Sequence, residues 1–141
     1  MRLGLLQKTL IFLLLFVSSA ALADVRVIAH PDLGEINLPP QQLRLLFSSQ
    51  IPYWPDGTPV TLVVMDKEHE WHRRFCQEVL SLFPYQLERV WRRRIYSGIG
   101  RAPIRVSSRE EMVNTVGRTK GAIGYVQMEE IPSQVVLVSV D

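Results

Sequence analysis

The sequence contains only one cysteine, Cys76, so the chain cannot form an intramolecular disulfide. Stability must therefore come from packing. We interpret Cys76, which follows Phe75 on an apolar helix face, as a core side chain rather than a reactive or intermolecular thiol. The sequence also lacks a serine nucleophile elbow, a P-loop and a dinucleotide-binding glycine fingerprint. We expect a non-enzymatic protein with no cofactor.

The chain also lacks a membrane-spanning apolar run and an excess of charge of one sign. Arg2 and Lys8 precede a short apolar stretch, and Ala21-Leu22-Ala23 follows it. This is the pattern of a secretory signal peptide that is cleaved after Ala23. The alternative, an uncleaved anchor, is disfavoured because a spanning helix needs about 20 apolar residues. Two of the 16 Lys and Arg residues lie in this segment and none of the 14 Asp and Glu residues does, so 14 basic residues remain against 14 acidic ones. This balance argues against nucleic-acid binding.

We therefore predict a signal peptide over residues 1–23 and one periplasmic domain over residues 24–141. Apolar patterning predicts strands at 25–29, 60–65, 121–126 and 135–140, and helices at 41–47, 66–80, 84–98 and 107–117. The 60–65 strand is apolar on both faces and must be covered on both sides. This alternation indicates an α/β fold with one open, mostly parallel mixed sheet and helices on both faces.

The Trp54-Pro55-Asp56-Gly57 turn precedes the 60–65 strand, and we interpret Trp54 as packed rather than ligand-stacking. The strand delivers Asp66, a predicted helix N-cap, and Lys67 to the edge where open α/β sheets bind ligands. Asp66, Glu68 and Glu70 put negative charge there, which opposes an anionic ligand.

A second candidate site follows the 84–98 helix. Ser97-Gly98-Ile99-Gly100 is either a helix C-cap or a backbone nest for an anion, assisted by Arg94 and Arg101. Neighbouring arginines of this helix, Arg89, Arg92 and Arg93, are interpreted as a solvated face balanced by Glu88 and other carboxylates.

The three histidines offer a third hypothesis, a metal-dependent enzyme. His69-Glu70-Trp71-His72 is one residue short of the zincin spacing, so we predict no metal site. A metal site would also require His30 to lie close to this helix and act as a third ligand. The simpler interpretation is surface or boundary histidines, with His72 packed beside Cys76.

Several stretches, in this order, resemble small periplasmic proteins of the binding-protein-like superfamily, commonly labelled phosphate transporter substrate-binding proteins. They are Leu45-Leu46-Phe47, the Trp54–Val60 segment, Trp91 to Gly100, and Gly121-Ala122-Ile123-Gly124-Tyr125-Val126. The resemblance implies a single three-layer lobe of the type II periplasmic binding protein fold, with ligand loops at strand ends. It also implies a phosphate or other small-anion component of an ABC transport system. The predicted ligand-binding residues are His30, Asp66, Lys67, Ser97, Gly98 and Arg101.

A competing hypothesis is a periplasmic protein–protein interaction or sensory accessory module that has lost anion binding. It would bind an envelope membrane protein or associate with itself. The surface between His30, Asp66 and Ser97 distinguishes the two hypotheses. A shared pocket there supports ligand binding, whereas separated side chains favour a partner surface.

Overall fold

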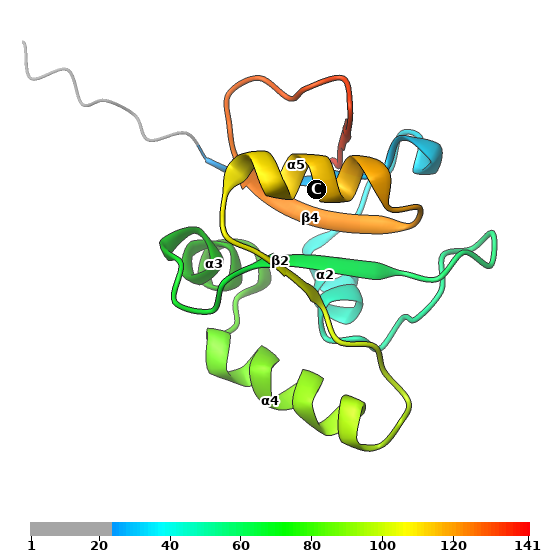
Figure 1. The fold of residues 1–141 in the computed structure, drawn as a ribbon, viewed down its shortest axis with the longest axis vertical. Helices are drawn as coiled ribbons and strands as arrows, with labels where there is room; N and C mark the ends of the chain where they lie inside the picture. Colours follow the sequence, from blue (N-terminus) through cyan, green and yellow to red (C-terminus); the bar gives the residue numbers. More distant parts are fainter. Residues whose placement is uncertain (1–23) are drawn as a thin grey trace, which may run out of the picture.

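The computed structural model describes residues 24–141, and the predicted signal peptide lies outside this described part. One five-stranded mixed sheet has the order β3-β2-β4-β1-β5 (Figure 1). The strands are β1 (Val25–Ala29), β2 (Thr61–Met65), β3 (Ile104–Val106), β4 (Ala122–Gln127) and β5 (Val136–Leu137). β2 pairs in parallel with β3 and β4, whereas β1 pairs antiparallel with β4 and β5. The predicted α/β class with an open mixed sheet is confirmed, with two parallel and two antiparallel pairings.

Helices cover both faces of the sheet, as predicted. They are the short 3-10 helix η1 (Pro31–Leu33), α2 (Pro40–Phe47), α3 (Glu70–Arg74), the π-helix η2 (Phe75–Leu80), α4 (Pro84–Tyr96) and α5 (Arg109–Arg118). A side chain at Gly124 would meet Met112 of α5, whereas the next residue, Tyr125, stacks on Phe75 of η2 and lies near Phe47 of α2. Because successive strand residues point to opposite faces, α5 covers one face and α2 with η2 covers the other.

The central strands β2 and β4 form the core. Val63, Val64 and Met65 of β2 and Ile123 and Tyr125 of β4 are almost inaccessible to solvent. This confirms that the strand predicted at 60–65 is buried on both faces. Within residues 24–141, no helix combines the length and the apolar character that crossing a membrane requires.

Two of the stretches that suggested the fold contact each other. The Trp54 indole Nε1 donates a hydrogen bond of 2.9 Å to the Gly121 carbonyl at the entry of β4, and Trp54 is buried. Gly121 has φ +77°, and a side chain there would come within 2.2 Å of the Pro59 carbonyl oxygen. Trp54 is therefore a structural residue, as predicted, and it fixes the loop that precedes β2 against the start of β4.

The structure corrects the predicted start of the helix after β2. Asp66 is not an N-cap: α3 begins at Glu70, and His69 is its N-cap, with the imidazole Nδ1 accepting from the Trp71 amide at 3.1 Å. The Asp66 carbonyl instead accepts from the His69 amide, which closes a turn over residues 66–69. This turn uses the residues that the prediction placed in the first helical turn.

Three further elements differ from the prediction. The segment from Phe75 to Leu80 is π-helical rather than α-helical, and it ends at Ser81 in the left-handed conformation. β3 was missed because it has only three residues, two of them exposed. The final strand is confined to Val136–Leu137, since Ser139 forms an isolated bridge with Asn37 rather than extending the strand.

Candidate functional site

The sheet register separates the predicted site residues into different places. Thr61 at the start of β2 is level with Ala122 at the start of β4, and the His30 amide donates to the Ala122 carbonyl at 2.9 Å. His30 therefore lies at the amino ends of β2 and β4. Asp66 follows β2 at its carboxyl end, five residues beyond Thr61, which is about 16 Å along a strand. His30 and Asp66 therefore do not form the shared pocket that would have supported ligand binding between them, so an anion site has to be argued from other residues.

His30 has a local structural role. Its Nδ1 accepts a hydrogen bond from the Asp32 amide at 3.1 Å, and it is the N-cap of the 3-10 helix η1. Its side chain is thus committed to the loop after β1.

Ser97, Gly98 and Arg101 lie beyond the carboxyl end of α4, away from Asp66. The Ser97 amide donates to the Arg93 carbonyl, the Gly98 amide to the Ile95 carbonyl, and the amides of residues 99 and 100 to the Arg94 carbonyl. These amides close a helix C-cap, with Gly98 at φ +70°. The C-cap interpretation is therefore the correct one, because the amides that a nest would offer to an anion are already bonded.

The histidines are also dispersed. His72 is fully buried and His69 caps α3, whereas His30 lies at the other end of the strands, after β1. Among residues 24–141, no three His, Cys, Asp or Glu side chains gather closely enough to hold a metal ion. The structure thus gives no site for the metal-enzyme hypothesis in this part of the chain.

Of the predicted residues, Lys67 lies in a cleft, between the start of α3 and the first turns of α4. The cleft has a volume of about 940 Å³ and opens at the carboxyl end of β2. Its lining is mostly charged and comprises Lys67, Glu68, Glu70, Arg73, Pro84, Tyr85, Glu88, Arg89 and Arg92. Arg89 and Arg92 were not predicted as site residues. The sequence signal that could have identified them is their spacing of three residues, which places both arginines on the same face of one helix.

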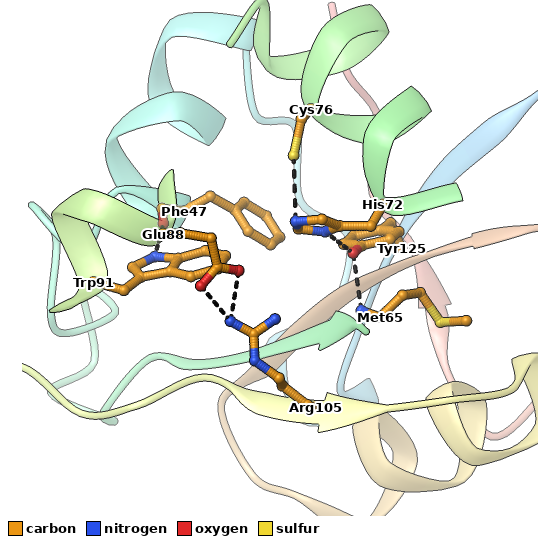
Figure 2. Close-up of polar contacts among 8 residues, drawn as sticks. All are labelled: Phe47, Met65, His72, Cys76, Glu88, Trp91, Arg105 and Tyr125. Atoms are coloured by element: carbon orange, nitrogen blue, oxygen red, sulfur yellow. Dashed lines mark hydrogen bonds and ion pairs between the residues drawn. The ribbon is translucent and has the colours of Figure 1, made fainter. Parts of the chain in front are cut away.

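Two of the three carboxylates in this charged cleft have cationic partners. Arg105 of β3 donates to both carboxylate oxygens of Glu88 at 2.6 Å (Figure 2). The Glu70 carboxylate lies 3.8 Å from the Arg73 guanidinium. Glu88 therefore pairs with Arg105 rather than with the arginines of its own helix, which corrects its part in our interpretation. Within residues 24–141, no ion pair involves Lys67, Arg89 or Arg92. The charged cleft thus presents three cations without carboxylate partners, beside one exposed carboxylate, Glu68.

The α4 wall of the charged cleft is held in place by contacts of Trp91 and Leu87. The Trp91 indole Nε1 donates to the Phe47 carbonyl at 2.6 Å, and the Arg105 guanidinium lies over the Trp91 ring at 5.7 Å (Figure 2). Leu87 is buried on the same helix face. Arg89 and Arg92 therefore project from a helix whose position is fixed on its other side.

The β2 wall is held by a polar network in the core. β2 pairs with β4 only over Thr61 and Leu62, and beyond that point the Tyr125 hydroxyl accepts from the Met65 amide at 2.9 Å. The same hydroxyl contacts the His72 imidazole, and Cys76 lies on the far side of that ring (Figure 2). Burial lowers the pKa of His72 to about 4 and raises that of Tyr125. The network is therefore uncharged at neutral pH, and it fixes the end of β2 from which Asp66 and Lys67 emerge.

A second hollow lies at the opposite, amino end of β2, and we call it the apolar groove. It has a volume of about 380 Å³. Its lining comprises Leu46, Ser49, Ile51, Pro52, Tyr53, Pro59, Val60, Thr61, Leu62, Arg94, Ile99, Gly100, Arg101, Ala102, Ile104 and Thr119. The predicted residue Arg101 belongs to this groove.

The architecture matches solved structures of phosphate-transport proteins. They include a chain assigned as a phosphate ABC transporter substrate-binding protein, with bound phosphate, from Clostridium perfringens (15% identity, TM-score 0.63). An ABC-type phosphate transport receptor from Vibrio cholerae (13%, 0.64) and PstS from Borrelia burgdorferi (15%, 0.63) match similarly. Each match covers 84% of this chain and 45–47% of the other chain. The chain has a periplasmic binding-protein-like fold.

The chain spans about half the length of these neighbours, and the likeness at 13–15% identity concerns the fold. No protein-family model matches the sequence, and a search of curated proteins found no match. The binding-protein-like fold that the sequence suggested is confirmed. The chemistry of its site must be argued from the residues of this chain.

Proposed function

We propose that this domain is a non-enzymatic binding-protein-like module that holds a small anion in the charged cleft. The observation that supports the proposal is the convergence of Lys67, Arg89 and Arg92 on this cleft without carboxylate partners in the described part of the chain. The charged cleft also opens at the carboxyl ends of the parallel strands β2 and β3, where open α/β sheets bind ligands.

The residue types suit an oxyanion. A guanidinium group offers paired N–H donors that match phosphate or carboxylate oxygens, and the lysine ammonium adds a point charge. Because the charged cleft is open on one side, a bound ion keeps part of its hydration shell, so we expect a dissociation constant near 1 mM, or about −4 kcal/mol. Phosphate is the first anion to test, because the structural neighbours are named for its transport.

Isothermal titration of residues 24–141 with phosphate, sulfate and succinate at low ionic strength tests this proposal. We expect saturable heat with at least one anion, and a loss of about tenfold or more in affinity in the Arg89→Gln/Arg92→Gln variant. Arg93→Gln is the matched control, because Arg93 is an exposed residue of the same helix that does not line the charged cleft. Absence of heat with all three anions at millimolar concentration would contradict anion binding.

We further propose that the domain works in the periplasm after removal of residues 1–23, and that it presents the anion to a membrane transporter. The signal-like sequence of these residues supports export. Mass spectrometry of the protein from the envelope fraction should give a mature chain that begins at Asp24. Recovery of the intact chain from the cytoplasm would contradict this part of the proposal.

A further inference from the structure

The apolar groove differs in chemistry from the charged cleft. Its lining contains two arginines, Arg94 and Arg101, and no Asp or Glu. Within residues 24–141, neither arginine forms an ion pair. The apolar groove therefore combines an apolar floor with uncompensated positive charge on one wall.

Its rim exposes apolar side chains that the fold itself does not cover. Ile99 is 74% exposed, Tyr53 is 60% exposed and Ile104 is 38% exposed, while Leu46 and Leu62 below them are buried. Exposed apolar side chains around a hollow are typical of a binding surface rather than of free surface. The volume of about 380 Å³ lies near the lower end of the range for small-molecule pockets and suits a few side chains.

Both walls of the apolar groove are formed by loops with their own hydrogen bonds. On one wall, the Val60 amide donates to the Pro52 carbonyl, and Trp54 is anchored to Gly121. On the other wall, Gly100 packs so closely on Arg94 that a side chain at Gly100 would come within 2.9 Å of the Arg94 Cβ atom. The two walls lie at the amino end of β2. Figure 1 shows that α3 lies at the other end of this strand. A groove with walls fixed in this way avoids the ordering cost that a flexible loop would add on binding.

We propose that the apolar groove docks a short segment of a partner protein in which a carboxylate lies next to apolar side chains. Charge complementarity selects this occupant, because both unpaired cations are on the wall and no acidic residue lines the groove. The same argument excludes the chain's own residues 1–23, which contain Arg2, Lys8 and no carboxylate. This site is independent of anion binding in the charged cleft.

Fluorescence anisotropy with two labelled, acetylated hexapeptides tests the assignment: one alternates glutamate with leucine and the other alternates glutamine with leucine. We expect saturable binding of the acidic peptide and at least about tenfold weaker binding of the amide peptide. Arg94→Gln/Arg101→Gln should abolish this discrimination, whereas Arg93→Gln, an exposed neighbour outside the apolar groove, should preserve it. Ile99→Ser should weaken both peptides, because it removes apolar contact without changing charge.

Equal affinity for the two peptides, or unchanged discrimination in the double arginine variant, would overturn the proposal. Displacement of the acidic peptide by decanoate with the same arginine dependence would assign the apolar groove to a small amphiphile instead. A dimer in sedimentation analysis that Ile99→Ser dissociates would assign it to a second copy of this chain. Phosphate titration of the Arg94→Gln/Arg101→Gln variant tests the two sites separately. A variant that loses peptide binding but still binds phosphate shows that the charged cleft is unaffected.

Discussion

The His72 imidazole Nδ1 and the Tyr125 hydroxyl are joined by a buried hydrogen bond of 2.5 Å. The hydroxyl accepts from the Met65 amide, and within residues 24–141 Nδ1 is the partner that can accept the hydroxyl proton, so we assign that proton to the hydrogen bond with Nδ1 and the imidazole proton to Nε2. Nε2 lies 3.7 Å from the Cys76 Sγ atom, which then accepts. The chain of contacts therefore links β4, α3 and η2 to the end of β2.

Tyr125→Phe should destabilise the protein by about 1–3 kcal/mol, because it leaves the Met65 amide and the His72 Nδ1 atom without a partner in the core. Urea unfolding at pH 7 measures the change in the free energy of unfolding. Tyr85→Phe is the matched control, because Tyr85 is 59% exposed, and it should change stability by less than about 0.5 kcal/mol. Equal effects of the two variants would show that the buried hydroxyl contributes nothing.

His72 should make stability depend on pH below neutrality. Burial is the main cause that lowers its pKa from 6.5 to about 4, so the unfolded chain binds more protons between these values. The stabilising contribution of neutral His72 is therefore complete above pH 6.5 and is lost as pH falls towards 4. The loss amounts to about 3 kcal/mol. Unfolding curves from pH 7.5 to 4 should show this decline, and His72→Gln should remove most of its slope over that interval; an unchanged slope would contradict the assignment.

The sequence predicted the central fold because the relevant signals are local. The apolar run of β2, the capping serine of α5 and the glycines around β4 each determine their own segment. The turn that delays α3 to Glu70 could not be predicted in the same way, because His69 competes with Asp66 as a cap through its imidazole. The three residues of β3 form a strand only because β2 lies beside them.

Cys76 should be unreactive towards thiol reagents in the folded protein. It is fully buried, and burial raises the pKa of its thiol to about 12, so almost no thiolate is present at neutral pH. Labelling with dithionitrobenzoate should proceed only at the rate of unfolding and become immediate in urea. A Cys76→Ala/Ser97→Cys variant, which moves the thiol to an exposed position, should react at once under native conditions. Rapid native labelling of Cys76 would instead indicate an accessible thiol.

Gly121→Ala should be far more damaging than Gly57→Ala, although both glycines have positive φ. A side chain at residue 121 would lie 2.2 Å from the Pro59 carbonyl oxygen, whereas one at residue 57 meets nothing within 4 Å. We expect Gly57→Ala to cost about 1–2 kcal/mol from the left-handed backbone alone. Gly121→Ala should cost at least about 2 kcal/mol more, because the loop held by Trp54 must move. Thermal unfolding of both variants measures the difference, and similar midpoints would refute the close packing.

The candidate sites were harder to predict than the fold, because they depend on which ends of the strands meet. His30 follows β1 and Asp66 follows β2. Because β1 runs antiparallel to β4 and β2 runs parallel to it, the two residues lie at opposite ends of the strands. Arg105 lies on a strand that was not predicted, so its ion pair with Glu88 was not expected either. Because Glu88 pairs with Arg105, it does not neutralise Arg89 and Arg92 on α4. This contact joins residues far apart in the sequence, so no local pattern predicts it.

Glu88 and Arg105 provide opposite tests of the proposed anion site. Glu88 lines the charged cleft, and its ion pair of 2.6 Å with Arg105 offsets its negative charge. Glu88→Gln removes a carboxylate from the lining and releases the Arg105 guanidinium, so it should tighten phosphate binding by about threefold or more. Arg105→Gln leaves Glu88 without its cation and should weaken phosphate binding by a similar factor. Calorimetric titration at low ionic strength, with urea unfolding to verify that both variants fold, measures the two effects, and shifts of the same sign would show that electrostatic attraction does not govern this cleft.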